Sequence, residues 1–311
     1  MFTSKRTITI FILVAVIVIL GSLLISDRQQ EKTTQQQQTE YSLLAKRLFV
    51  EDPNDTLINF IPLRAALKKY LASTGIEHSL MLEYLPTGTT VRVDENNKLV
   101  GASLLKLPVV ISLYKAVEQG KISLDQTITI TQEMIDNRFG ELWRKGPGAK
   151  ITLREAVRLT LIESDNTAAN VITKGLGNTV ADNESVLAEL DIEVQTTGTE
   201  TTRISARDYS SILKCLYLSC YLHRNDSQDI LRQLSEAVDF GRIASGIPSE
   251  VAVAHKIGVY GDDVQSDCGI VYIPNRPYTI CIMLRANPNE AAKHMHMISK
   301  LAYDYINDQE R

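Results

Sequence analysis

The order of strand-like and helix-like segments is the feature of this chain that most limits its possible folds. Two strand-like runs, "HSLMLEYL" and "TVRVD", flank the turn "PTGT", and three more, "VAVAHKIGV", "CGIVYIP" and "YTICIML", lie near the carboxyl end. The sequence between them has the apolar spacing of helices, and "PNEAAKHMHMISKLAYDYIND" adds a last helix. Strands from both ends with helices between predict an α+β fold, with an antiparallel sheet flanked by helices.

The first 56 residues predict a membrane anchor and a tether. Residues 8–25, "ITIFILVAVIVILGSLLI", carry no charge over 18 residues, which is enough to cross a bilayer. Lys5 and Arg6 precede this run, so the positive-inside rule predicts a cytoplasmic tail at residues 1–7 and an exported remainder. No small-residue cleavage site follows, so we expect a single-pass anchor in the cell membrane. Residues 26–40 are polar and glutamine-rich. We expect residues 26–56 to form a linker, which leaves residues 57–311 as an extracytoplasmic domain.

Charge and cysteine content exclude some functions. The formal net charge is -4 and no basic patch stands out, so we expect no nucleic-acid partner. The four cysteines form no CxxC pair and lie at no zinc-like spacing from histidines, so we expect no metal. Cys268 and Cys281 fall on neighbouring predicted strands and can face each other. A disulfide between them stays open, and two buried free thiols are the simpler expectation.

The stretch "GASLLKLPVV", residues 101–110, places Lys106 one helical turn after Ser103 within an apolar run. Residues three apart lie on one face of a helix, so the two side chains can meet. A buried lysine finds partners or loses its proton, and a neutral amine can activate a serine hydroxyl. The pairs Ser112–Lys115 and Ser211–Lys214 have the same spacing but no accompanying motif, so we expect them to be structural.

Two further motifs follow Ser103 in a recognisable order. "ESDNTAAN" contains Ser164, Asp165 and Asn166, 61 residues after Ser103, and "HKIGVYG" contains Lys256. The order S-x-x-K, S-D-N and a K-T-G-like triplet is that of penicillin-recognising serine enzymes. Over roughly residues 57–311 the chain resembles the class A β-lactamase and D,D-peptidase superfamily, also in "PGAKITLREAVRLTLIESDNTAAN" and "GIVYIPNRPYTICIML". The resemblance implies an all-helical subdomain beside the sheet.

The resemblance also implies the roles of individual residues in acyl-enzyme chemistry. Ser103 would be the nucleophile and Lys106 its base, with Ser164 relaying a proton and Lys256 supplying a second cation that lowers the pKa of Lys106. The main-chain N–H groups of Ser103 and Val259 would form the oxyanion hole. The substrate-binding residues would be Asn166, Ile257 and Gly258. Covalent serine chemistry of this kind needs no cofactor, and we expect His255 to be a packed, hydrogen-bonded histidine.

The sequence departs from the family at two places. Class A β-lactamases normally carry a deacylating glutamate in a loop after S-D-N, and here that interval looks short. Glu200, 36 residues after Ser164, is the available substitute, although an exposed loop acid is the simpler interpretation. Ile257 stands where the family usually has threonine or serine, so the hydroxyl that would bind a substrate carboxylate is missing. A substrate without a free terminal carboxylate therefore stays open.

These observations predict a membrane-anchored serine hydrolase or acyltransferase that forms an acyl-enzyme on Ser103. Its expected substrates are cell-wall peptides, in a D,D-peptidase-like reaction, or β-lactams that it opens slowly. A class A-type β-lactamase is one alternative. A non-catalytic or single-acylation penicillin-binding sensor module is the other.

Overall fold

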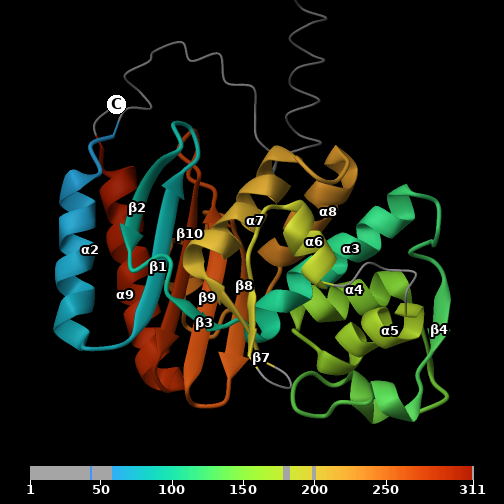
Figure 1. Ribbon diagram of the computed structural model, residues 1–311. Helices are drawn as coiled ribbons and strands as arrows, with labels where there is room; N and C mark the ends of the chain where they lie inside the picture. Colours follow the sequence, from blue (N-terminus) through green and yellow to red (C-terminus); the bar gives the residue numbers. More distant parts are fainter. Residues whose placement is uncertain (1–42, 44–57, 178–182, 198–200, 310–311) are drawn as a thin grey trace, which may run out of the picture. The chain divides into compact units, whose positions relative to one another are not determined.

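The computed structural model describes Leu43 and residues 58–177, 183–197 and 201–309 (Figure 1). The predicted tail, anchor and most of the linker lie outside the described residues, as does Glu200. Among the residues that are described, no helix is both long and apolar enough to cross a membrane. The chain divides into residues 1–42 and 43–311, and the following description concerns the second unit.

A five-stranded antiparallel sheet forms the centre of this unit, in the order β2-β1-β10-β9-β8. Strand β1 from the amino-terminal side pairs with β10 near the carboxyl end, with Leu82 opposite Ile280. This pairing confirms the α+β fold predicted from the strands at both ends of the domain. The strands are β1 (His78–Tyr84), β2 (Thr89–Val93), β8 (Val253–Tyr260), β9 (Val264–Val271) and β10 (Tyr278–Arg285).

Helices cover both faces of the sheet (Figure 1). On one face lie α2 (Ile61–Thr74) and α9 (Pro288–Asn307), whose apolar residues form one buried cluster with those of the strands. Leu63, Leu67 and Leu71 recur every four residues and give α2 a single buried stripe. On the other face, α7 (Ala206–Leu218) and α8 (Arg224–Ser235) pack against the strands. Strand β8 is one of the two edge strands of this sheet, and the helical lobe lies beside it (Figure 1).

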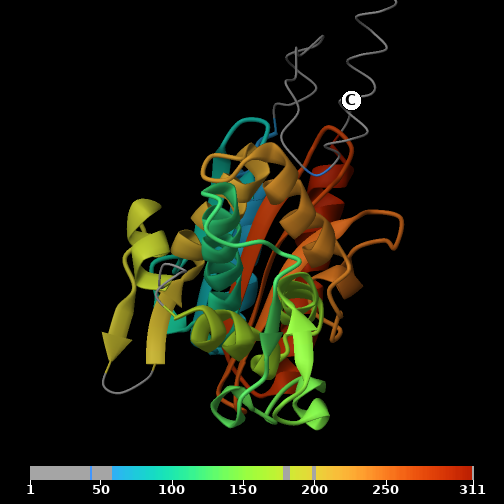
Figure 2. The ribbon, with the colours of Figure 1, turned by 90° about the vertical axis from the view of Figure 1, so that its right-hand side faces the viewer.

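The helical lobe is built around α3 (Lys106–Glu118), which is buried from Leu107 to Tyr114 and follows the 3-10 helix η2 (Ala102–Leu105). Pro108 lies in the first turn of α3, where its missing N–H does little harm. The other helices of the lobe are α4 (Leu153–Ile162), α5 (Asn166–Leu176) and α6 (Asn183–Glu189), with short 3-10 helices η3 (Gln132–Met134) and η4 (Leu142–Lys145). Contrary to the all-helical expectation, strands β4 (Thr127–Thr129) and β5 (Lys150–Thr152) pair within this lobe (Figure 2).

A small second sheet connects the two parts of the unit. It has the order β3-β7-β6, from β3 (Lys98–Val100), β7 (Thr201–Ser205) and β6 (Gln195–Thr197). Strand β3 leads directly into η2 and α3. The sheet therefore fixes where the chain enters the helical lobe, immediately before Ser103.

The cysteines form two disulfides, Cys215–Cys220 and Cys268–Cys281. Cys268 and Cys281 are direct partners across β9 and β10, and both are fully buried. The favoured expectation of free thiols is therefore wrong. Strand register, which sequence spacing does not determine, sets these two side chains opposite each other.

Candidate active site

A cavity of about 570 Å³ lies between β8 and the helical lobe. It brings together six of the residues singled out from the sequence: Ser103, Lys106, Ser164, Asn166, Ile257 and Val259. Its other lining residues are Ala102, Arg138, Phe139, Tyr260 and Gly261. Lys256 and Gly258 lie behind this lining, on β8. Three segments that are distant in the sequence thus meet at one cavity.

Ser103 lies on η2, at the entrance to α3. Ala102, immediately before it, has a φ of 45°, a left-handed conformation that costs a non-glycine residue roughly 1–3 kcal/mol. The main-chain N–H of Lys106 donates to the carbonyls of Ser103 and Leu104, which tightens the turn. Because α3 begins here, its dipole favours negative charge that develops beside Ser103.

Gly258 allows β8 to approach this turn closely. A Cβ at this position would lie 3.0 Å from Leu104 Cγ and 3.1 Å from the Gly101 carbonyl oxygen. Any side chain here would push β8 and η2 apart. The glycine therefore keeps Ser103 and Val259, which carry the N–H groups of the predicted oxyanion hole, on facing walls of the cavity.

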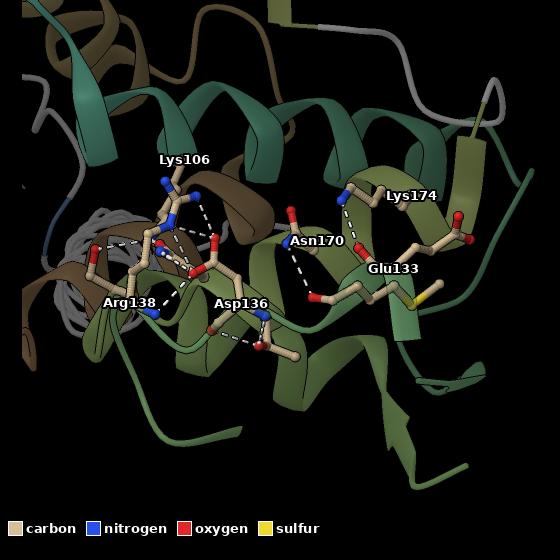
Figure 3. Close-up of polar contacts among 10 residues, drawn as sticks. Lys106, Glu133, Asp136, Arg138, Asn170 and Lys174 are labelled. Atoms are coloured by element: carbon tan, nitrogen blue, oxygen red, sulfur yellow. Dashed lines mark hydrogen bonds and ion pairs between the residues drawn. The ribbon is translucent and has the colours of Figure 1, made fainter. Parts of the chain in front are cut away.

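Lys106 connects the start of α3 to the segment before α5. Its Nζ donates to Asn166 Oδ1 at 2.6 Å, to Ser164 Oγ at 3.3 Å and to the Ser164 carbonyl oxygen (Figure 3). Burial lowers the pKa of Lys106 to about 8, against the opposing effect of the Asp165 and Asp136 carboxylates. Roughly a tenth of this amine is therefore neutral at pH 7 and about half at pH 8, beside a serine that lines the same cavity.

Ser164 lies between two lysine amines. Lys256 Nζ donates to Ser164 Oγ at 2.7 Å and to the Ile257 carbonyl oxygen at 3.2 Å. Ser164 is 2% exposed and has a φ of 56°, a second left-handed residue at the cavity. Because both amines contact one oxygen, at 2.7 and 3.3 Å, their nitrogen atoms are at most 6.0 Å apart.

Two ammonium groups at that separation repel each other by about 3 kcal/mol at an effective dielectric constant of about 20. Burial, and then the charge of Lys106, lowers the pKa of Lys256 well below its ordinary value. The two amines therefore titrate as a coupled pair. The state with one ammonium and one neutral amine is favoured over the doubly protonated state that two ordinary lysines would adopt. The Ser164 hydroxyl, in contact with both, can pass a proton between them.

Asp165 fixes the geometry of the S-D-N segment through hydrogen bonds to its side chain. Its buried carboxylate accepts 2.8 Å hydrogen bonds from the N–H groups of Ala168 and Leu142, so it caps α5 and anchors η4. Gly140 packs so tightly here that a Cβ would lie 2.1 Å from Asp165 Oδ2. These contacts hold Ser164 and Asn166 in place on either side of Asp165.

Asn166 links Lys106 to a part of the site that the sequence did not reveal. Its amide Nδ2 donates to Asp136 Oδ1 at 3.2 Å. An amide carries two N–H donors, so this bond is compatible with donation to a substrate carbonyl. Asp136 also forms an ion pair with Arg138 (Figure 3), and the hydrogen bonds from Arg138 lower the pKa of Asp136 far below its ordinary value.

The loop that carries Asp136, Arg138 and Phe139 is held by one face of α5. Lys174 donates to the carbonyl of Glu133, and Asn170 to that of Met134 (Figure 3). Further contacts join Thr167 to both main-chain groups of Asp136, and the Asn166 N–H to the Phe139 carbonyl. Spacings of three and four residues along "NTAANVITK" are the one sequence signal for this face, but nothing in them identifies the partner loop.

The remaining sequence-derived residues lie away from the cavity lining. His255 is 1% exposed, and its Nδ1 lies 2.9 Å from Asp267 Oδ1, which confirms a packed, hydrogen-bonded histidine. Burial opposes protonation of His255, but the Asp267 carboxylate outweighs it and raises the pKa. Lys115 donates to the Tyr221 carbonyl and Lys214 to Glu83, so the two other Ser-x-x-Lys pairs serve structural contacts.

One group among the described residues has metal-ligand geometry: Glu118, His223 and Asp226. None of the three lines the cavity. The Glu118 carboxylate already accepts hydrogen bonds from Lys115 and from the His223 N–H. This group is therefore not part of the site around Ser103.

The comparisons with known proteins agree with this geometry. The sequence profile of the beta-lactamase enzyme family matches residues 62–306. Beta-lactamase VEB-1 from Pseudomonas aeruginosa is 21% identical over 241 residues, which cover 70% of this chain and 81% of that protein. A beta-lactamase from Phocaeicola vulgatus is 24% identical over 246 residues, or 70% and 76% of the two chains.

Solved structures share the fold. A mutant of PBP-A, in an acyl-enzyme complex with penicillin G, superposes with a TM-score of 0.73 at 22% identity, covering 79% of this chain and 96% of that one. A beta-lactamase from Sphaerobacter thermophilus gives a TM-score of 0.73 at 21% identity, covering 82% and 100%. With its family profile matched across the domain, the chain belongs to the beta-lactamase enzyme family and is a serine hydrolase.

Proposed function

We propose that the protein forms an acyl-enzyme on Ser103 and acts on cell-wall peptides in a D,D-peptidase-like reaction, with β-lactams as slowly processed mimics. The observation that carries this proposal is the convergence of Lys106 and Lys256 on Ser164 Oγ, at the cavity that Ser103 lines. This arrangement supports a base, a proton relay and a nucleophile that act at one cavity.

In this mechanism, neutral Lys106 takes the proton of the Ser103 hydroxyl as Oγ attacks the substrate carbonyl carbon. The negative charge on the carbonyl oxygen is stabilised by the N–H groups of Ser103 and Val259. The proton then passes through Ser164 Oγ to the leaving nitrogen, the carbon–nitrogen bond breaks, and an ester to Ser103 remains. Water or an acceptor amine later attacks this ester and releases the serine.

The composition of the cavity favours slow deacylation. Its described lining contains no aspartate or glutamate, so no carboxylate of that lining is available to activate a water molecule. A penicillin adduct would then persist, as expected of a peptidase. The names of the beta-lactamase relatives favour the alternative, efficient β-lactam hydrolysis, and in that case Glu200 or another group outside the described residues would supply the base.

We also propose that the domain acts outside the cytoplasmic membrane, tethered by residues 8–25. The sequence of that segment supports an anchor. The two disulfides support an oxidising compartment, because such bonds are rare in the cytosol. A cysteine-blocking assay on unreduced protein isolated from cells would measure them, and four reactive thiols would count against export.

The proposal is tested by intact-protein mass spectrometry after exposure to benzylpenicillin, followed by peptide mapping. We expect one adduct on Ser103, and none in a Ser103→Ala variant. A long-lived adduct together with hydrolysis of a wall peptide, either release of terminal D-alanine or cleavage of a cross-link, supports the peptidase. Rapid turnover of a chromogenic cephalosporin supports the β-lactamase alternative. A long-lived adduct without peptidase activity indicates the sensor module. An adduct that survives in Ser103→Ala would refute the assignment of the nucleophile.

A further inference from the structure

We infer that the cavity wall next to Ser164 accepts a neutral, apolar part of the substrate and excludes a carboxylate. The inference rests on the proposed function, since it concerns the group that lies beside Ser103 during acylation. It narrows the substrate class to acyl donors whose part at this wall ends in an amide or ester or continues as peptide.

The β8 side of this wall is apolar. Ile257 lines the cavity beside Lys256, and the residue is only 6% exposed. Val259 and Tyr260 extend the same lining toward the opening, where Tyr260 is 45% exposed. These residues offer no charged donor that a carboxylate prefers.

The wall contributed by the helical lobe carries one aromatic side chain, next to the ion pair of Arg138 with Asp136. Phe139 lines the cavity, and its carbonyl accepts the N–H of Asn166, which places it beside the S-D-N segment. Its ring packs edge-on against Phe240, with 6.3 Å between ring centroids. Phe240 is half exposed, so the pair presents apolar surface at the rim.

The cations around this wall already have acceptors. Lys106 donates to Ser164 and Asn166, and Arg138 binds the Asp136 carboxylate. Lys256 is 1% exposed and donates to Ser164 Oγ and the Ile257 carbonyl.

Arg242 is buried behind β8, where it donates to the Gly258 and Ser266 carbonyls and to Gln265. A carboxylate against Ile257 would therefore lose its hydration without gaining a comparable set of donors.

During acylation the Ser103 Oγ–carbon bond forms and the carbon–nitrogen bond breaks, with the serine proton ending on the leaving nitrogen. In the proposed mechanism Ser164 donates the proton to that nitrogen, and Ser164 Oγ also contacts Lys256, the neighbour of Ile257 on β8. The group attached to the nitrogen would therefore lie against the Ile257 wall. An internal peptide bond presents a neutral amide there, whereas the last bond of a peptide presents a free carboxylate. The geometry thus points to cleavage or transfer within a cross-link or chain.

The test compares the rates at which benzylpenicillin and its neutral methyl ester acylate the full-length protein. Mass spectrometry of the intact protein measures both rates. Two variants form a matched pair, because threonine and valine have nearly the same shape and differ by a hydroxyl: Ile257→Thr and Ile257→Val. We expect wild type and Ile257→Val to acylate with the ester at least as fast as with the acid. Ile257→Thr should raise the acid-to-ester rate ratio roughly tenfold or more over Ile257→Val.

The possible results separate this inference from the proposed function. A tenfold preference of wild type for the acid, or equal ratios in the two variants, would overturn the inference and leave the acyl-enzyme intact. If neither probe forms an adduct on Ser103 in wild type, the proposed function fails and the inference fails with it.

Discussion

Lys106 makes the stability of the protein depend on pH in a way that can be calculated. Its pKa falls from 10.5 to about 8 in the folded protein, chiefly because it is buried. Between these two values the unfolded chain binds more protons than the folded one, so the free energy of unfolding rises with pH. For a shift of this size the rise amounts to about 2.5 kcal/mol between pH 7 and pH 10.

Replacing Lys106 by methionine removes this contribution and keeps an unbranched side chain of similar length. Urea unfolding of wild type and Lys106→Met at pH 7 and pH 10 gives a difference in which the titrations of groups that are not coupled to Lys106 cancel. We expect wild type to gain about 2.5 kcal/mol relative to the variant over this interval. Lys121→Met, just beyond α3 and exposed, controls for the loss of one lysine. A relative change below about 0.5 kcal/mol would show that Lys106 keeps an ordinary affinity for its proton in the fold.

Substitutions at three further positions test the frame around the site and the deacylation step. Asp165→Ala removes two 2.8 Å hydrogen bonds to a buried carboxylate and should lower the free energy of unfolding by roughly 2–4 kcal/mol, with a smaller loss in Asp165→Asn. Equal stability of wild type and both variants would contradict the capping role. Gly258→Ala places a Cβ 3.0 Å from Leu104 Cγ, so we expect stopped-flow acylation to slow roughly tenfold or more, and an unchanged rate would show that β8 and η2 need not approach so closely. Glu200→Gln should leave the lifetime of the penicillin adduct unchanged in timed mass spectra, whereas a tenfold longer lifetime would identify Glu200 as the deacylating base.

The fold could be predicted from the sequence where short-range patterns determine the structure. The hairpin around "PTGT" and the C-terminal helix carry their own turn and spacing signals, and strands at both ends of the domain leave few topologies. Strand register is different, because it depends on packing across the whole sheet. The Cys268–Cys281 bond follows from register, so the sequence left it open.

The residues of the cavity divide in the same way, into those that a short sequence motif identifies and those that only tertiary contacts bring to the site. Ser103, Lys106 and Ser164 were found because each belongs to a short motif with fixed spacing. Asp136 and Arg138 were missed, since they lie in a loop with no motif and reach the site through tertiary contacts with α5.

The dependence of Ser103 acylation on pH tests most directly the central claim that a neutral amine activates the serine. The rate constant for benzylpenicillin adduct formation should rise about tenfold per pH unit below pH 8 and level off above it, because the pKa of Lys106 is about 8. In Lys106→Arg, whose guanidinium stays protonated, this rise should disappear together with most of the activity. A rate independent of pH from 6 to 9 in wild type, or full activity in Lys106→Arg, would contradict the account.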